Sequence, residues 1–93
     1  MKTPESYEKQ AIKKYLDSIG AWYFSPYMAG FGKSGVGDIV GCYNSAFFSI
    51  EVNREGKEPT KIQERHMAEI EAAGGMAFWG PAEKVIENFR QRI

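Results

Sequence analysis

The sequence predicts an α/β fold in which a four-stranded mixed sheet is flanked by helices, in the order α-β-β-β-α-β-α. Apolar residues recur at helical spacing in three segments, and short runs rich in aromatic and β-branched residues lie between them. A helical segment separates the third and fourth of these runs, which is typical of a crossover between parallel strands. The chain has 93 residues, which predicts a single domain spanning 1–93.

The first helix is expected to begin at Thr3-Pro4, with Thr3 as the N-cap and Pro4 at the first helical position. Gly20 is expected to end it. Its apolar residues recur at helical spacing, and they are Tyr7, Ala11, Ile12, Tyr15, Leu16 and Ile19. The run "AWYF" that follows predicts a short strand, and the glycine-rich "GFGKSGVG" predicts a loop.

The next segment predicts a β-hairpin, because "DIVGCY" and "AFFSIEV" are separated only by Asn44 and Ser45. Cys42, inside the first of these strands, is expected to be a small core residue. A second loop follows, and Thr60 with Gln63 three residues later matches a capping box at the start of a helix. Gly74-Gly75 ends that helix, "MAFW" is the last strand, and residues 82–92 form the last helix.

The composition limits the functional classes. The formal net charge is zero, which excludes binding of nucleic acid by overall charge alone but allows a local basic surface. No apolar run is long enough to cross a bilayer, and the polar N-terminus does not resemble a secretory signal. A single cysteine excludes an internal disulfide framework and suits a reducing compartment. We therefore expect a cytoplasmic protein that does not bind membranes.

The hairpin predicts a pair of carboxylates. If Asn44 and Ser45 are the two turn residues, then Asp38 lies opposite Glu51, and Asn53 shares the face of Glu51. Two carboxylates placed in this way repel each other, so a shared proton or a cation is needed, and Mg²⁺ is bound by one or two carboxylates with water and phosphate oxygens. The alternative is that both are solvated residues at the strand ends, and a one-residue slip in register would separate them.

The stretch "GVGDIVGCYNSAFFSIEVN", followed by "PTKIQERHMAEIEAAGG", resembles the VRR-NUC branch of the PD-(D/E)xK nuclease superfamily. The family pattern is an Asp after a Gly/Pro-containing loop, a hairpin, Glu-x-Lys, and a helix that carries Gln. The resemblance implies a restriction endonuclease-like core and hydrolysis of DNA phosphodiesters with Mg²⁺ or Mn²⁺ as cofactor. It also implies a small phage or bacterial protein that forms a homodimer and cuts four-way (Holliday) junctions or other branched DNA.

The resemblance also implies roles for individual residues. Asp38 and Glu51 match the metal-binding carboxylates, and the backbone carbonyl of Val52 would be a further ligand. Glu8, on the first helix, matches an acidic residue that reaches the same metal. Gln63 matches the Gln of the helix beside the site, although as part of a capping box it could serve only that helix.

Asn53 departs from the family pattern, which has Lys at that position. An amide can form hydrogen bonds but supplies no charge, so we expect impaired catalysis with metal binding largely retained. Three explanations remain open: a deliberate inactivating substitution, a natural residue whose missing charge is supplied by Lys57, Lys33 or Lys61, or a natural pseudo-nuclease.

Basic and polar residues in the two loops around the carboxylates are candidates for DNA contact, with solvated loop positions as the alternative: Lys33, Ser34, Arg54, Lys57 and Lys61. The glycine-rich loop lacks the Gly-Lys-Ser/Thr that opens a helix in a P-loop, so we expect no nucleotide cofactor. The sequence therefore favours a metal-dependent endonuclease acting on branched or duplex DNA. The alternative is a non-catalytic DNA-binding module or a pseudo-nuclease subunit on the same fold.

Overall fold

The computed structural model describes residues 4–26 and 37–93, and its element order is the predicted one. The helices are α1 (Pro4–Ile19), α2 (Lys61–Ala72) and α3 (Ala82–Arg92). The strands are β1 (Trp22–Phe24), β2 (Ile39–Tyr43), β3 (Ala46–Val52) and β4 (Met76–Gly80). None of the described helices is long and apolar enough to cross a membrane.

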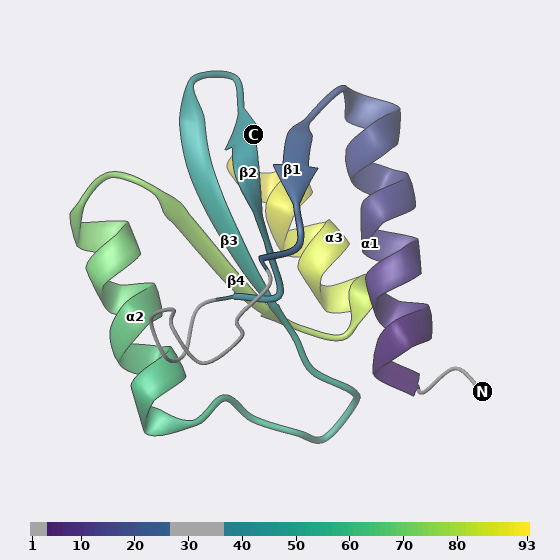
Figure 1. Cartoon of the computed structure of the whole chain (residues 1–93), viewed down its shortest axis with the longest axis vertical. Helices are drawn as coiled ribbons and strands as arrows, with labels where there is room; N and C mark the ends of the chain where they lie inside the picture. The colour runs from purple at the N-terminus through teal and green to yellow at the C-terminus, as the bar shows by residue number, and fades with distance from the viewer. Residues whose placement is uncertain (1–3, 27–36) are drawn as a thin grey trace.

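The four strands form one mixed sheet in the order β1-β2-β3-β4 (Figure 1). The β1–β2 and β2–β3 pairs are antiparallel, whereas β3 and β4 are parallel and are connected through α2. Crossover and hairpin connections therefore lie where the sequence predicted them.

The β2–β3 hairpin has the predicted two-residue turn. Asn44 and Ser45 both have positive φ, 52° and 71°, which is the type I′ conformation that matches the twist of the flanking strands. Tyr43 consequently pairs with Ala46, and Ile39 pairs with Ile50. Continuing this register by one position sets Asp38 opposite Glu51.

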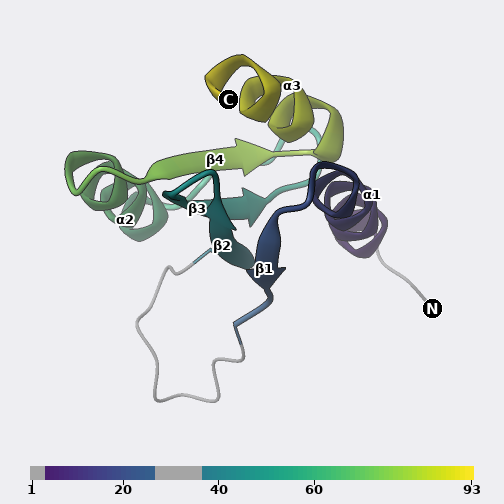
Figure 2. The same ribbon diagram turned by 90° about the horizontal axis from the view of Figure 1, so that it is seen from above.

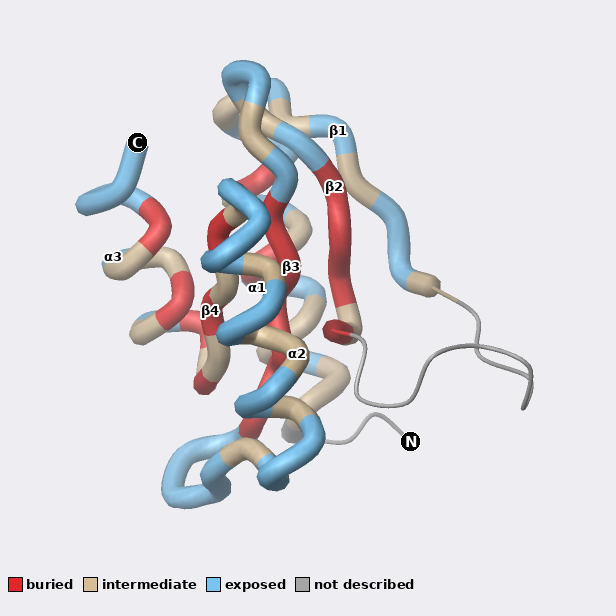
Figure 3. Tube along the Cα trace, turned by 90° about the vertical axis from the view of Figure 1, so that its left-hand side faces the viewer, coloured by how far each residue is buried: buried red, intermediate tan, exposed pale blue. Residues whose placement is uncertain are grey.

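Helices α1 and α3 pack together on one face of the sheet and α2 lies apart from them, next to the start of β4 (Figure 2). The core lies between the sheet and the α1–α3 layer, and buried segments are visible on β2, β3, β4 and α3 (Figure 3). Phe89 is at its centre, because its ring contacts the rings of four aromatic residues: Tyr15, Tyr43, Phe48 and Phe78.

Helix α1 follows the prediction in part. Ile12 and Leu16 are fully buried, but Tyr7 and Ala11 are exposed, so the buried face is narrower than the apolar pattern suggested. Gly20, with φ of 78°, ends the helix in a Schellman motif, in which Ala21 N donates to Leu16 O at 3.0 Å. Thr3, the predicted N-cap, lies outside the described residues.

The second face of the sheet is only partly covered. Strand register sets Trp22, Cys42 and Phe47 side by side across β1, β2 and β3 on this face, and all three are exposed. The prediction that Cys42 is a core residue is wrong. Its side chain is exposed on this face, and the core contains the strand residues that point to the other face. An apolar cavity of about 700 Å³ lies between this face and α2 and is lined by Phe47, Ile70 and their neighbours.

Candidate active site

The candidate active site is a small polar pocket at the end of the hairpin strands, with a volume of about 230 Å³. Three parts of the chain that lie far apart in the sequence line it: the start of α1, the ends of the hairpin strands, and the loop that leads into α2. The lining residues are Glu5, Lys9, Asp38, Glu51, Val52, Asn53, Lys57, Thr60 and Gln63. It is separate from the larger apolar cavity, which contains neither of the paired carboxylates.

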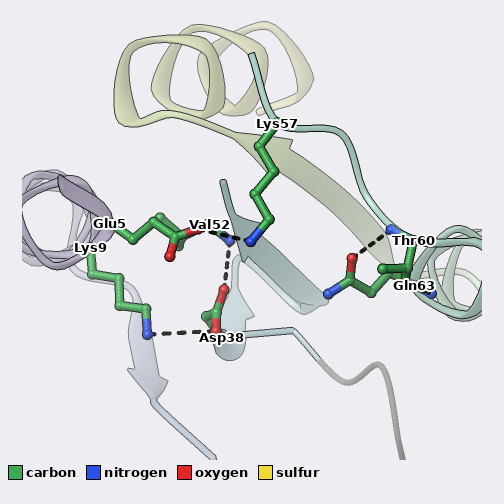
Figure 4. Close-up of polar contacts among 7 residues, drawn as sticks. All are labelled: Glu5, Lys9, Asp38, Val52, Lys57, Thr60 and Gln63. Atoms are coloured by element: carbon green, nitrogen blue, oxygen red, sulfur yellow. Dashed lines mark hydrogen bonds and ion pairs between the residues drawn. The ribbon is translucent and has the colours of Figure 1, made fainter. Parts of the chain in front are cut away.

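Asp38 lies immediately before β2 and is tied to the neighbouring strand. Its Oδ2 accepts a hydrogen bond from Val52 N at 2.8 Å, and its Oδ1 forms an ion pair with Lys9 Nζ at 3.6 Å (Figure 4). Gly37, the preceding residue, allows this approach, since a β-carbon there would lie 2.3 Å from Ser49 Oγ. The carboxylate of Asp38 is therefore fixed at the end of the hairpin.

Glu51 is buried, with 8% of its surface exposed, and its Oε2 has no hydrogen-bond partner within residues 4–26 and 37–93. Burial is the main cause that raises the pKa of Glu51 to about 8, and the negative charge of Asp38 raises it further. Lys9 and Lys57 act in the opposite direction. Two carboxyl groups in one pocket thus disfavour the doubly ionised state unless a cation or a proton compensates.

Asn53 is also buried, with 3% of its surface exposed. Its backbone N–H donates to Gly80 O at 3.0 Å, which extends the parallel β3–β4 pairing past the end of the strand. Its side-chain Nδ2 has no partner among the described residues. The amide therefore lines the pocket with an unused donor.

Gln63 combines the two roles that the sequence left open. Its Oε1 accepts a hydrogen bond from Thr60 N at 2.8 Å, and its backbone N–H donates to Thr60 Oγ1 at 3.3 Å. These two hydrogen bonds form the capping box of α2. The same side chain lines the pocket, and Figure 4 shows its Nε2 turned toward the pocket. Forming the cap leaves that amide nitrogen available as a donor.

Glu8 lies outside this pocket. Its Oε2 accepts a hydrogen bond from Ala82 N at the start of α3, and it lines a different pocket near Pro81. The carboxylate that α1 contributes to the site is Glu5, which pairs with Lys57 Nζ at 3.5 Å (Figure 4). The structure does not bring Glu8 to Asp38 and Glu51, because its position on α1 is directed toward the first turn of α3.

The sequence reasoning missed Glu5 and Lys9, although a signal for them exists. Positions 5, 9, 12 and 16 form one stripe along a helix, so both residues share the face of the fully buried Ile12 and Leu16. Charged residues that extend such a stripe beyond the core are expected at its edge, where the sheet ends and the pocket begins.

The predicted DNA contacts are distributed unevenly. Lys57 lines the carboxylate pocket, whereas Arg54 lines an adjoining pocket of about 410 Å³ together with Lys57 and Lys84. Lys61 is exposed at the first position of α2 and lines neither pocket. Lys33 and Ser34 lie outside the described residues.

The donors in the pocket suit a hard cation. In the described part of the chain, no group of three or more His, Cys, Asp or Glu side chains is arranged to hold a metal ion. Three carboxylates line the pocket, and two of them, Asp38 and Glu51, lie opposite each other beside the backbone of Val52. Mg²⁺ accepts this kind of site, because it keeps several waters and often binds through one or two carboxylates plus substrate phosphate.

Solved structures with the same arrangement of elements exist. One, described as "VRR_NUC domain", matches with a TM-score of 0.80 and 18% sequence identity over 97% of both chains. The chain has the VRR-NUC fold. A second structure, described as "VRR_NUC domain protein", matches with a TM-score of 0.69 and 16% identity, covering 100% of this chain and 91% of the other. No protein-family model and no curated protein sequence matches the chain.

The VRR-NUC fold agrees with the predicted restriction endonuclease-like core of four mixed strands and flanking helices. At 18% and 16% identity, this likeness establishes the fold and not the activity. Activity has to be inferred from the pocket itself.

Proposed function

We propose that the chain is a divalent-metal-dependent endodeoxyribonuclease that hydrolyses phosphodiesters in branched DNA, with Mg²⁺ or Mn²⁺ as its cofactor. The observation that carries the proposal is the meeting of Asp38 and Glu51 in one polar pocket of a VRR-NUC fold. Four-way junctions are the proposed substrate class on the strength of the family resemblance.

The residues present fit a metal ion. Among the described residues the buried Glu51 Oε2 lacks a partner, and burial, with the charge of Asp38, raises the pKa of this carboxyl. Asp38, Glu51 and the carbonyl of Val52 would hold the ion, while Glu5 lines the same pocket as the ion-pair partner of Lys57. A bound ion supplies Lewis acidity toward a phosphate oxygen and makes water more acidic.

The remaining side chains orient and bind the DNA. Gln63 can donate from Nε2 to a phosphate oxygen or to water, because its Oε1 is engaged by the cap. Arg54 and Lys84 line the adjoining pocket and provide positive charge for the DNA backbone beside the carboxylates. Lys84 was not among the predicted contacts.

We further propose a homodimer, because a four-way junction is two-fold symmetric and paired cuts need two centres in matching orientation. Exposed aromatic residues on the second sheet face, Trp22, Phe24 and Phe47, supply apolar surface that supports self-association. Sedimentation equilibrium of the purified chain should show a dimer, and a monomer at every concentration would contradict this part of the proposal.

Cleavage of a labelled four-way junction, compared with a linear duplex of the same sequence, tests the nuclease. The Asn53→Lys form should cut the junction with Mg²⁺ or Mn²⁺, stop cutting with chelator, and lose the activity when Asp38→Asn is added. The chain with Asn53 should cut more slowly, since it lacks that ammonium. If Asn53→Lys never cuts any branched or duplex DNA in either metal, the proposal is wrong.

The second candidate is a non-catalytic DNA-binding module, and Asn53 is the observation that favours it. A buried neutral amide stands where the family pattern has an ammonium. Junction binding by this chain, without cleavage by either the Asn53 or the Asn53→Lys form, would support this candidate over the nuclease.

A further inference from the structure

The pocket lacks an ammonium at position 53 but contains one from another position. Asn53 is buried and neutral, and in the part of the chain that the structure describes its Nδ2 has no acceptor. The negative charge that develops on a phosphate during hydrolysis is stabilised best by a positioned cationic donor. The neighbouring cations therefore decide how much of this stabilisation the chain retains.

A turn after β3 returns the chain toward the pocket. Lys57 N donates to Arg54 O at 3.1 Å, and Gly56 has φ of 85°, a conformation that few residues other than glycine adopt readily. This reversal brings Lys57, four residues beyond Asn53, to the same pocket that Asn53 lines. Figure 4 shows the Lys57 side chain reaching from the loop into the site.

The ammonium of Lys57 is available for a new partner. Its ion pair with Glu5 is 3.5 Å long, and the two side chains are 55% and 36% exposed. Such exposed pairs contribute little stability, and lysine carries its charge on a flexible four-carbon stem. A phosphate entering the pocket can replace Glu5 as the partner at little cost.

Lys9 is the competing cation, but its partner differs. Lys9 Nζ lies 3.6 Å from Asp38 Oδ1, an oxygen of a carboxylate proposed to hold the metal ion. A metal ion at that carboxylate repels an ammonium beside it. Lys9 is therefore placed to neutralise Asp38 when no metal is bound, whereas Lys57 is placed to meet the substrate.

We propose that Lys57 supplies, from the loop after β3, the positive charge that the family pattern has at position 53. This inference rests on the proposed nuclease function. It makes Lys57 a catalytic residue that contacts the phosphate. Of the three explanations for Asn53, it favours the natural residue whose missing charge is supplied from another position.

A double-mutant cycle between positions 53 and 57 tests the inference. In the chain with Asn53, Lys57→Gln should lower kcat about 10²-fold, as expected for the loss of one positioned donor to the transition state. KM for the junction and the calorimetric affinity for Mn²⁺ should change little, which separates this role from DNA or metal binding. Lys57→Arg should restore much of the rate, because it keeps the charge.

In the Asn53→Lys background, Lys57→Gln should have much less effect, since residue 53 then supplies the charge and the two substitutions are not additive. Lys14→Gln, an exposed lysine elsewhere on α1, is the matched control and should leave kcat unchanged in both backgrounds.

The outcomes distinguish this inference from the proposed function. Activity in Asn53→Lys combined with an unchanged rate for Lys57→Gln in the Asn53 chain would overturn only the inference. The inference would also be overturned if Lys9→Gln, and not Lys57→Gln, lowered kcat in the Asn53 chain and had little effect in the Asn53→Lys background. A complete lack of cleavage by Asn53→Lys would overturn the nuclease function itself.

Discussion

Asp38 accepts a hydrogen bond from the backbone amide of Val52 at 2.8 Å, across the open end of the hairpin. This bond holds one carboxylate against the strand that carries the other, so Asp38 and Glu51 are fixed in one pocket before any ligand binds. The pocket is therefore preorganised by a backbone contact, to which the ion pair of Asp38 with Lys9 adds.

Metal binding should depend on both carboxylates. Asp38→Asn and Glu51→Gln are each expected to weaken Mn²⁺ binding about tenfold or more, because a carboxylate ligand is replaced by a neutral amide. Isothermal titration calorimetry without DNA measures this directly. Glu64→Gln, an exposed carboxylate on α2, is the control and should bind Mn²⁺ as the unmodified chain does. Equal affinity in all four proteins would exclude this pocket as the metal site.

Stability of the metal-free protein should fall as pH rises from about 4.5 to about 8. The folded-state pKa of Glu51, about 8, is above its ordinary value of 4.5, so the folded state retains a proton that the unfolded state releases in this range. The loss should be on the order of 5 kcal/mol, because each pH unit between the two pKa values removes about 1.4 kcal/mol. Urea unfolding at several pH values would show it.

Glu51→Gln provides the control for that titration. The glutamine cannot ionise, and every other titrating group is still present. The variant should lack this part of the pH dependence and should be more stable than the unmodified chain near pH 8. A pH profile that is identical with and without Glu51 would mean that its carboxyl is not buried as described.

Glu8 should contribute to stability without contributing to metal binding. Pro81, the N-cap residue of α3, makes no side-chain capping bond, and Glu8 of α1 instead accepts from Ala82 N. Glu8→Ala should therefore cost about 1 kcal/mol of unfolding free energy, as the loss of a capping acceptor does. Glu5→Ala is the comparison, and it should cost less stability, because the exposed ion pair of Glu5 with Lys57 contributes little. Loss of Mn²⁺ affinity in Glu8→Ala would restore the original assignment from the sequence.

Gly41 should not tolerate a side chain. A β-carbon at this position would lie 2.0 Å from Trp22 O and 2.7 Å from Tyr23 Cα, which are backbone atoms of the neighbouring strand. Gly41→Ala should destabilise the protein by about 2 kcal/mol by forcing β1 away from β2. Cys42→Ala, at the next position and exposed, should change stability much less. Similar denaturation midpoints for the two variants would show that β1 does not pack this closely.

Phe89 should be the most sensitive position of α3. Its fully buried ring meets four other aromatic rings, so Phe89→Ala should cost about 3–5 kcal/mol, a large fraction of the stability of a small domain. Phe24→Ala removes a ring that is 50% exposed and should cost far less. Chemical denaturation of both variants measures the difference, and comparable losses would place the core elsewhere.

Local sequence determined the secondary structure and the hairpin register. Two residues that accept positive φ fixed the turn, and the two-residue period of the strands then set Asp38 opposite Glu51. The capping box at Thr60 and Gln63 was readable for the same reason, because all its partners lie within three residues.

Tertiary structure decided which residues from other elements join the carboxylates. Glu8 lies about one turn before Ile12 on α1, and Glu5 lies about two turns before it. Both therefore edge the buried face, and the sequence could not tell which carboxylate faces the end of the sheet and which faces α3. The packing of α1 against α3 made that choice, and the turn after β3 brought Lys57 into the pocket. Helical and strand periods specify the face on which a side chain lies, but the groups that share a pocket depend on how separate elements pack.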